Sequence, residues 1–422
     1  MTRAGRPAQR VRCDACGQGF AAARLLSQCP CGGLLAVEQA PGLRGVALRS
    51  RFEARRAGDP AGQGSGVWRY RELLLSGTRF VTHPEGNTAL YRREPVAAWV
   101  GVEDLALKHE GENPTGSFKD RGMTVAVTQA VRAGATAVAC ASTGNTAASM
   151  AAYAAQAGRL ALVFVPAGKV AAGKLAQSLA YGARTLLVRG DFDACLRLAR
   201  EASAALGIAF LNSINPWRVE GQKTIVFELL HQRGWDPPDW IVVPAGNLGN
   251  TSAFGKALRE AKALGLIRRV PRIAAVQARG ANPFQRGYRV GFRRRYALKA
   301  ETVATAIRIG DPASWDRAVR AIRETRGVVE VVSDREILEA KAVVDAAGIG
   351  CEPASAAAVA GVRKLRRAGA IRAGDAVVAV LTGHLLKDPQ AVIDFHRGGA
   401  RRSNPPVEIE ASVAAVERVL RR

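Results

Sequence analysis

The feature that most constrains the fold is an alternation of short apolar runs with alanine-rich stretches from Trp68 onward. The apolar runs predict strands, and the stretches between them predict helices. The predicted strands are 135–140, 160–165, 185–188, 240–243, 272–277 and 376–381, and the predicted helices are 147–156, 174–181, 191–205 and 251–263. Alternation at this spacing predicts an α/β fold with parallel sheets wrapped by helices, in which ligands bind beyond the carboxyl ends of the strands.

Three predicted strands end in polar or glycine-rich loops. The first loop, 142–146 (STGNT), offers hydroxyls, an amide and backbone N–H groups at a helix start, which suits a carboxylate or phenolate oxygen. In the second, 246–250 (GNLGN), glycines let backbone N–H groups converge on a phosphate, without the ending of a P-loop or the spacing of a dinucleotide fingerprint. The third, 381–384 (LTGH), places a hydroxyl where it can meet a ring nitrogen. Each loop alone is also compatible with a plain cap or turn.

A lysine lies in an unusual place after a turn-rich segment. The turn signals of 113–116 (NPTG) lead to Ser117, which we expect to cap a helix with Lys119 on its first turn. The positive end of the helix dipole disfavours an ammonium there, so the position suits a lysine that works as a neutral amine or an imine. From this segment alone, an ordinary surface lysine is an equally good interpretation.

The lysine and the three loops fit one cofactor. Pyridoxal phosphate needs a lysine for its aldehyde, an anion site for its phosphate, a donor near its phenolate and a partner at its ring nitrogen. Lys119, the 246–250 loop, Asn145 and Thr382 supply these four groups. The combination predicts a pyridoxal-phosphate enzyme.

The sequence also resembles a known family over roughly residues 68–395. The segment 113–121 (NPTGSFKDR) is similar to the cofactor-lysine signature of the threonine synthases, within the tryptophan-synthase-β-like (fold type II) pyridoxal-phosphate enzymes. Three more segments agree: 141–149 (ASTGNTAAS), 351–356 (CEPASA) and 382–389 (TGHLLKDP). The resemblance implies two doubly wound α/β domains around the cofactor.

The resemblance further implies roles for individual residues. Lys119 forms the Schiff base and then moves protons at Cα and Cβ of the substrate. Asn145 hydrogen-bonds the phenolate oxygen, and the neutral hydroxyl of Thr382 faces the ring nitrogen and leaves it unprotonated. The cofactor phosphate is expected on Gly246, Asn247, Leu248, Gly249 and Asn250. The substrate carboxylate is expected on the loop of Ser142, Thr143 and Thr146, and the substrate phosphate near Ser213 and Arg218, with Lys169 and Thr146 as weaker choices.

The reaction implied is the conversion of O-phospho-L-homoserine and water to L-threonine and phosphate, by γ-elimination of phosphate and addition of water at Cβ. The chain would then be a carbon–oxygen lyase acting on a phosphate. Two alternatives within the same enzyme class stay open: a paralogue such as cysteate synthase, which uses phosphoserine and sulfite, or an amino-acid dehydratase. A basic zinc-ribbon protein that binds nucleic acid on a disused enzyme scaffold is disfavoured, because every cofactor residue is intact.

Four of the seven cysteines lie near the N-terminus. Cys13 and Cys16 form a C-x-x-C pair, and Cys29 and Cys31 form a shorter C-x-C pair followed by two glycines. Thiolates paired on two tight turns are what tetrahedral Zn²⁺ requires, so these four residues predict a structural zinc ribbon. Reduced cysteines without metal are the alternative interpretation.

The net charge of +25 raises the question of a nucleic-acid partner. The basic residues are spread along the chain, aromatic residues make up only 6%, and none interleaves with them as a stacking motif would. These patterns favour general surface charge over nucleic-acid binding. No signal-peptide h-region or membrane-spanning run is visible, so we expect a cytoplasmic protein.

The domain organisation follows from these patterns and the resemblance. We expect a cysteine ribbon at 1–40 and a linker at 41–66, where the composition is rich in glycine and arginine. A larger cofactor-binding domain is expected from 67–120 and 206–422, and a smaller mobile domain from 121–205. The family usually forms dimers, which implies a homodimer.

Overall fold

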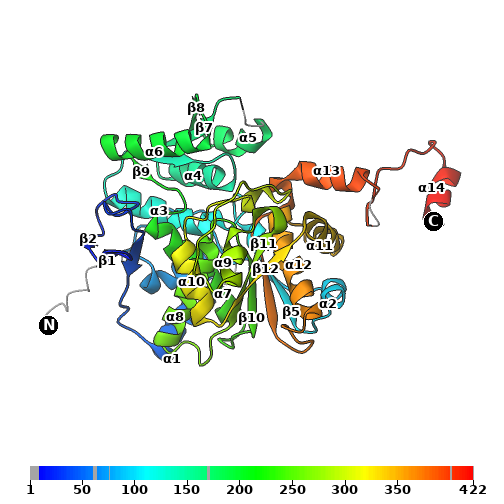
Figure 1. Cartoon of the computed structure of the whole chain (residues 1–422), viewed down its shortest axis with the longest axis horizontal. Coiled ribbons are helices and arrows are strands. Elements are labelled where there is room, and N and C mark those ends of the chain that lie inside the picture. Colours follow the sequence, from blue (N-terminus) through cyan, green and yellow to red (C-terminus); the bar gives the residue numbers. More distant parts are fainter. Residues whose placement is uncertain (1–8, 60–63, 76, 169–171, 400–401, 422) are drawn as a thin grey trace.

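The computed structural model describes residues 9–59, 64–75, 77–168, 172–399 and 402–421. Two largely parallel sheets form the framework (Figure 1). The larger has the strand order β12-β11-β10-β13-β5-β4, and only β4 runs antiparallel to its neighbour. Its strands are β4 (Leu90–Tyr91), β5 (Leu105–His109), β10 (Trp240–Pro244), β11 (Arg272–Ala278), β12 (Val328–Val332) and β13 (Val377–Leu381). The smaller has the order β8-β7-β6-β9, from β6 (Ala137–Ala141), β7 (Leu160–Pro166), β8 (Arg184–Val188) and β9 (Ala209–Phe210).

Helices cover both faces of each sheet, as buried parallel strands require. Along β10, Ile241 and Val243 join the core on one face, while Trp240 and Val242 join the core on the other. The helices are α1 (Gly45–Ala57), α2 (Glu94–Val100), α3 (Lys119–Arg132), α4 (Asn145–Gln156), α5 (Ala172–Ala180), α6 (Phe192–Leu206), α7 (Pro216–Gln232), α8 (Gly249–Ala263), α9 (Pro283–Arg289), α10 (Trp315–Glu324), α11 (Asp334–Ala346), α12 (Pro353–Arg367), α13 (Pro389–Arg397) and α14 (Val413–Leu420).

The six strands and four helices predicted from the sequence are confirmed, with ends that differ by one or two residues. The structure adds β5 and β12, which the sequence did not reveal. The predicted cofactor loops all follow strands: 142–146 follows β6, 246–250 follows β10 and 382–384 follows β13. Figure 1 shows the smaller sheet and its helices above the larger body. Strand β9 belongs to the smaller sheet, although its residues follow the boundary that we expected at 205.

The expectation of a linker at 41–66 was wrong for its central part. Residues 45–57 form α1, and its Leu48 and Phe52 are buried in the core of the larger body. Phe52 packs edge-on against Tyr70, with 5.0 Å between ring centroids. The arginine-rich composition hid two apolar residues spaced by four, which lie on one side of a helix. Residues 60–63 of the expected linker lie outside the described part.

The cysteine ribbon is a three-stranded antiparallel sheet of β1 (Arg10–Cys13), β2 (Gly19–Ala21) and β3 (Leu35–Glu38). Its Phe20 and Leu35 belong to the same buried cluster as Met123 and Val127 of α3. Gln129 of α3 donates a 2.6 Å hydrogen bond to the Ala22 carbonyl. The ribbon is therefore packed into the framework.

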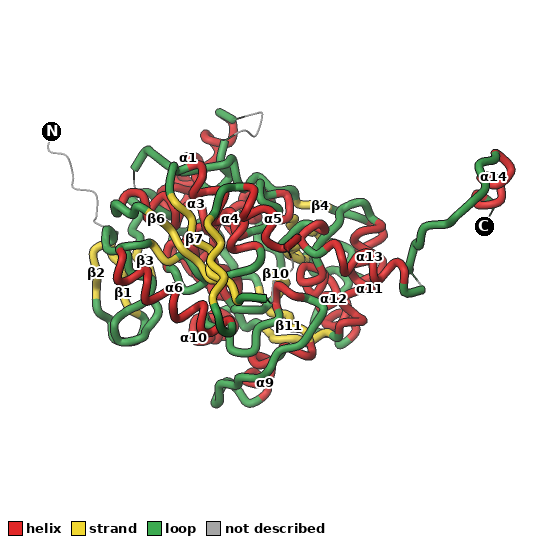
Figure 2. Tube along the Cα trace, turned by 90° about the horizontal axis from the view of Figure 1, so that it is seen from above, coloured by secondary structure: helices red, strands yellow, loops and turns green. Residues whose placement is uncertain are grey.

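The chain leaves the body at its C-terminal end. Figures 1 and 2 both show α13 at the edge of the larger body and α14 projecting well beyond it. Among the helices of the described residues, none has the length and apolar character needed to cross a membrane.

Candidate active site

The loop before α3 is held by a carboxylate on the helix itself. The Asp120 carboxylate accepts bonds from the Thr115 backbone N–H at 2.7 Å and the Thr115 hydroxyl at 2.6 Å. The Ser149 hydroxyl of α4 donates to it as well, at 2.5 Å. The expected cap by Ser117 is absent: Phe118 is the N-cap, and Ser117 Oγ only receives a long 3.4 Å bond from the Lys119 N–H. Lys119 thus lies in the first turn of α3, as predicted. The side chain that holds the preceding loop in place is Asp120, and not Ser117.

The Lys119 amine lies in a poorly solvated environment. The pKa of Lys119 is lowered to about 7, mainly by burial and also by the positive charge of Arg218, while the Glu352 carboxylate opposes both. Its side chain keeps some exposed surface, although protein surrounds the amine closely enough to desolvate it. A lysine with this pKa is a neutral nucleophile in about half of the molecules at pH 7.

The loop after β13 is bonded directly to the start of α3. The Phe118 N–H donates to the Thr382 carbonyl at 3.0 Å, and the His384 N–H donates to the Gly116 carbonyl at 2.9 Å. Thr382 is buried, and its hydroxyl oxygen lies 3.1 Å from Ser355 Oγ, within hydrogen-bond distance. The structure therefore brings Thr382 and Lys119 to one site.

Asn145 reaches the same site from the start of α4. Its side-chain N–H donates to the Glu352 carboxylate at 3.1 Å, and the Thr382 hydroxyl lies 3.4 Å from the other oxygen of that carboxylate. Glu352 is buried, and burial raises its pKa against the opposing effects of the Asn145 amide and the Lys119 charge. Glu352 belongs to the 351–356 segment of the family resemblance, but the sequence alone assigns it no role.

The 246–250 loop leads into α8 as expected for an anion site. Leu248 adopts a left-handed φ of 64°, which turns the chain into the helix. Thr251, in the first turn of α8, has a buried hydroxyl without a hydrogen-bond partner among the described residues. An unsatisfied hydroxyl at a helix N-terminus fits a phosphate oxygen.

The side chain of Asn247 fastens the 246–250 loop to its surroundings. Its amide donates to Ser213 Oγ at 3.0 Å and accepts from the Ala313 N–H at 2.9 Å. It therefore fixes the 246–250 loop to two neighbouring loops. A phosphate would meet Gly246, Leu248, Gly249 and Asn250 and the backbone of Asn247 through main-chain groups.

Arg218 of α7 is a buried cation that has no anionic partner in the described part of the chain. The side chain is 1% exposed, and its Nη1 donates to the Leu211 carbonyl at 3.2 Å. Its Nε and Nη2 have no partner among the described residues, and burial lowers the pKa of Arg218 to about 10. A buried guanidinium left unpaired is costly unless an anion completes it.

The predicted substrate loop, with Ser142, Thr143 and Thr146, is half-buried between β6 and α4. Asn212 holds the end of β6 by two 2.9 Å bonds to the backbone of Ala141. Sequence reasoning missed this contact, which links the 142–146 loop to the segment that carries Ser213 and Arg218. Lys169 lies outside the described residues.

The four N-terminal thiols converge. Their sulfur atoms all lie within 4.8 Å of one another, with 3.5 Å between Cys13 and Cys31 and 3.7 Å between Cys16 and Cys29. A tetrahedral zinc with Zn–S bonds of about 2.3 Å separates its sulfurs by about 3.8 Å. A hydrogen bond from the Cys16 backbone is the largest effect that lowers the pKa of Cys13, to about 6, as a thiolate ligand requires.

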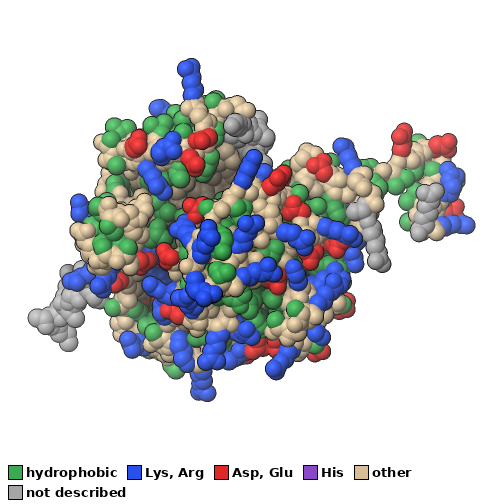
Figure 3. Space-filling view, viewed as in Figure 1, with side chains coloured by type: hydrophobic (Ala, Val, Ile, Leu, Met, Phe, Trp, Pro, Cys, Tyr) green, Lys and Arg blue, Asp and Glu red, His purple; other side chains and the backbone are tan. Residues whose placement is uncertain are grey.

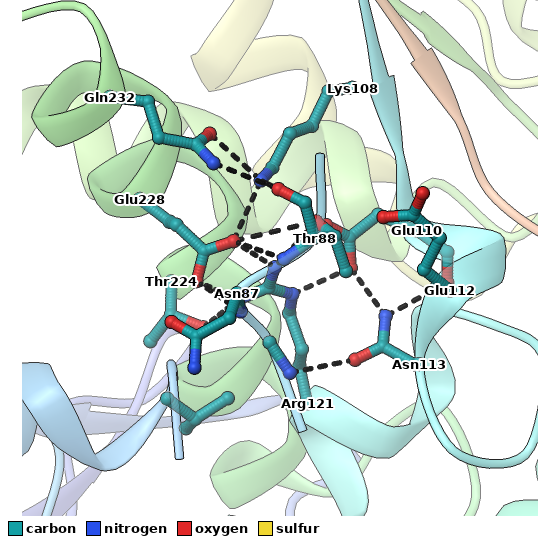
Figure 4. Close-up of polar contacts among 12 residues, drawn as sticks. Asn87, Thr88, Lys108, Glu110, Glu112, Asn113, Arg121, Thr224, Glu228 and Gln232 are labelled. Atoms are coloured by element: carbon teal, nitrogen blue, oxygen red, sulfur yellow. Dashed lines mark hydrogen bonds and ion pairs between the residues drawn. The ribbon is translucent and has the colours of Figure 1, made fainter. Parts of the chain in front are cut away.

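A second polar cluster lies behind the site (Figure 4). Arg121 of α3 forms ion pairs with Glu110 at 2.6 Å and with Glu228 of α7 at 2.7 Å, and Lys108 of β5 also pairs with Glu228 at 2.7 Å. All four side chains are fully buried. We call these four residues the buried quartet. Helices α3 and α7 pack closely at this point. A Cβ added at Gly221 of α7 would lie only 1.7 Å from the Arg121 carbonyl oxygen, so only glycine fits there. The quartet thus fixes the helix that begins with Lys119.

The surface is consistent with a small-molecule site. Figure 3 shows a recess between the lobe that carries α6 and the main body, while basic side chains are spread over the visible face with acidic ones among them.

Comparison with known proteins places the chain in a family. Residues 81–383 match the family model described as "Pyridoxal-phosphate dependent enzyme". A threonine synthase from Methanocaldococcus jannaschii is 42% identical over 97% of this chain and 99% of its own length. Another, from Methanosarcina acetivorans, is 48% identical over 84% of this chain and 86% of its own.

A solved threonine synthase from Escherichia coli covers 98% of this chain and 99% of its own, with a TM-score of 0.67. Its 17% identity shows the fold alone. The family model and the two threonine synthase relatives carry the assignment further: the chain belongs to the pyridoxal-phosphate-dependent enzymes and, within them, to the threonine synthase family.

Proposed function

We propose that the chain is a threonine synthase that converts O-phospho-L-homoserine and water to L-threonine and phosphate. The observation that carries the substrate class is the buried Arg218 guanidinium, whose Nε and Nη2 lack partners among the described residues and whose charge acts on Lys119. A dehydratase acting on an unphosphorylated amino acid has no use for this cation, whereas a phosphorylated substrate completes it.

Pyridoxal phosphate fits the residues present. Lys119 would hold it covalently, Asn145 would donate to its phenolate oxygen, Thr382 would meet its ring nitrogen, and the 246–250 loop with Thr251 would hold its phosphate. When bound, the cofactor supplies the electron sink for proton removal next to the substrate amino group. The low pKa of Lys119 lets the amine take up and release protons near neutral pH.

The substrate would lie between the 142–146 loop and α7. Ser142, Thr143 and Thr146 would bind its carboxylate through hydroxyls and the N-terminus of α4. Arg218 and Ser213 would bind its phosphate and, after elimination, keep the phosphate ion in the site, with Lys169 and Thr146 as weaker candidates. Retention of phosphate would favour addition of water over early release of an unsaturated product.

Closure of the smaller domain would exclude water until it is needed. Lys387, after β13, donates to the Thr115 carbonyl at 2.9 Å and also bonds Gln177 of α5. This contact is where the smaller lobe meets the loop before Lys119. The part around 121–205 would move over the substrate at this boundary.

We extend the proposal to a structural zinc ion on Cys13, Cys16, Cys29 and Cys31, supported by the sulfur spacing. A homodimer, which rests on the family resemblance, and a cytoplasmic location remain part of the proposal. Nucleic acid is disfavoured as a partner, because acidic side chains interrupt the basic ones on the visible face.

The discriminating experiment supplies the holoenzyme with three substrate sets: O-phospho-L-homoserine, phosphoserine with sulfite, and threonine alone. We expect threonine and phosphate from the first set. Cysteate from the second set would identify a cysteate synthase, and a keto acid with ammonia from the third would identify a dehydratase.

A further inference from the structure

The side-chain amide of Gln222, in α7, is buried without a partner. The residue is 4% exposed, and among the described residues its amide forms no hydrogen bond. Two N–H groups and a carbonyl oxygen are therefore removed from water without compensation, which costs folding free energy. Buried polar groups in native proteins are almost always satisfied, so this amide is a candidate for contact with a ligand.

The amide lies between the starts of two helices. A Cβ added at Gly122 would lie 3.3 Å from Gln222 Nε2, and one added at Gly249 would lie 3.4 Å from Gln222 Oε1. Gly122 is in the first turn of α3, three residues after Lys119, and Gly249 is the first residue of α8. Glycine at both positions leaves the amide room between the two helices.

The start of α8 offers free donors beside this amide. Within the described part of the chain, the backbone N–H groups of Gly249, Asn250 and Thr251 have no acceptor, and the Thr251 hydroxyl has no partner. Free N–H groups at a helix N-terminus favour an anion. Gln222 is a second group, from a different helix, that is unsatisfied at the same place.

The Gln222 amide can turn an N–H toward such an anion. A phosphate dianion only accepts hydrogen bonds, so it selects the orientation in which Nε2 lies on the Gly249 side. No hydrogen bond to a described residue holds the amide in the opposite orientation, so a half-turn about its last side-chain bond breaks no contact of this kind. The amide is therefore free to act as a donor.

Two phosphates are expected in this region, and the position of the amide decides between them. Arg218, one turn before Gln222 on α7, is the residue assigned to the substrate phosphate. The Gln222 amide lies instead beside Gly249, which belongs to the 246–250 loop assigned to the cofactor phosphate. Its position therefore favours the phosphate of the cofactor.

We propose that Gln222 is a binding residue for the cofactor phosphate and donates a side-chain N–H to it at the start of α8. This inference rests on the proposed function. It adds a side chain from α7 to a phosphate site otherwise formed by the 246–250 backbone and Thr251. Helix α7 then contacts both phosphates, the cofactor's through Gln222 and the substrate's through Arg218, and so holds them at a fixed separation.

The test compares two ligands that differ only in the phosphate. Cofactor-free wild type and Gln222→Met are titrated with pyridoxal phosphate and with pyridoxal, and Schiff-base absorption reports binding to Lys119. A hydrogen bond to a charged group is worth enough that Gln222→Met should bind pyridoxal phosphate about ten- to a hundredfold more weakly. Its affinity for pyridoxal should stay that of the wild type, because no phosphate is present to contact.

Two further variants separate a phosphate contact from a structural role. Gln222→Glu keeps the size of the side chain but places a carboxylate beside the phosphate, so it should lose more pyridoxal-phosphate affinity than Gln222→Met. Gln390→Met, at an exposed position in α13, should match the wild type with both ligands. Thermal unfolding of the cofactor-free proteins checks that each is folded, and if Gln222→Met does not fold, the two affinities of Gln222→Glu decide.

Equal losses of affinity for pyridoxal phosphate and pyridoxal would show a structural role and overturn the inference. Unchanged affinity for both ligands would also overturn it, and a raised KM for the phosphorylated substrate in that variant would move Gln222 to the substrate phosphate. These outcomes leave the proposed function intact. A wild-type protein that does not bind pyridoxal phosphate would instead contradict the proposed function.

Discussion

Phe118 donates its backbone N–H to the carbonyl oxygen of Thr382 over 3.0 Å, and this bond joins the helix that begins with Lys119 to the loop after β13. A backbone bridge between Ser117 and Gly383 reinforces it. The proposed covalent anchor of the cofactor and its proposed ring-nitrogen partner therefore belong to one hydrogen-bonded unit. Asn145, by contrast, comes from the smaller lobe and meets that unit through Glu352.

Arg218→Met should weaken binding of the phosphorylated substrate. Charge-assisted hydrogen bonds are worth about 1.5–3 kcal/mol, so kcat/KM should fall about ten- to a hundredfold, mainly through KM. Inhibition by inorganic phosphate should weaken in parallel. The matched control is Arg259→Met at an exposed ion pair. Unchanged KM and phosphate inhibition would remove Arg218 from the substrate site.

Covalent capture of pyridoxal phosphate by the cofactor-free protein should depend on pH through Lys119. Since burial lowers the pKa of Lys119 to about 7, the neutral amine increases as pH rises and is nearly complete above about pH 8. The capture rate should therefore level off there, whereas a free lysine side chain keeps gaining reactivity toward pH ~10. Arg218→Met removes a charge that lowers this pKa, so its midpoint should move to higher pH. A rate that still climbs steeply above pH ~8 in the wild type would contradict the shifted pKa.

Elemental analysis should find one zinc ion per chain. Cys16→Ser changes an exposed thiol, which costs little unless that thiol holds a metal. We expect this variant to lose zinc and to unfold several degrees below the wild type. After treatment with a chelator the two proteins should unfold at the same temperature. A zinc-free wild type, or a variant as stable as the wild type before chelation, would argue for reduced cysteines without metal.

Breaking the buried quartet should destabilise the protein strongly. Glu228→Ala leaves the charges of Arg121 and Lys108 without their shared partner, which should cost about 3–5 kcal/mol of unfolding free energy. Glu324→Ala breaks an exposed pair and should cost about 0–1 kcal/mol. Urea unfolding of both variants measures the difference. Similar costs would mean that the quartet adds no more than a surface pair.

The framework could be predicted wherever burial follows directly from an apolar run. Strand β10 is uninterrupted and was found, whereas β5 contains Lys108 and was missed. Burial of Lys108 depends on Glu228, which is supplied by a distant helix. The helix α1 was missed for a related reason, since its arginines outnumber the apolar residues that enter the core.

The cofactor residues could be proposed because each combines a distinctive side chain with a strand end or helix start. The structure brings Lys119, Asn145 and Thr382 together through Glu352. Glu352 itself could not be assigned, because its role depends on contacts with two loops far away in the sequence. The side-chain contacts of Asn247 could not be predicted for the same reason: its partners, Ser213 and Ala313, are adjacent to it only in the folded chain.

The most direct test of the proposed function measures the products formed from O-phospho-L-homoserine by the holoenzyme and by Lys119→Ala. The wild type should be yellow when isolated with its cofactor and should release threonine and phosphate in equal amounts, because each turnover eliminates one phosphate and adds one water. Lys119→Ala should lose both the visible absorption band and the reaction. Phosphate release without threonine, or an undiminished reaction in Lys119→Ala, would contradict the account.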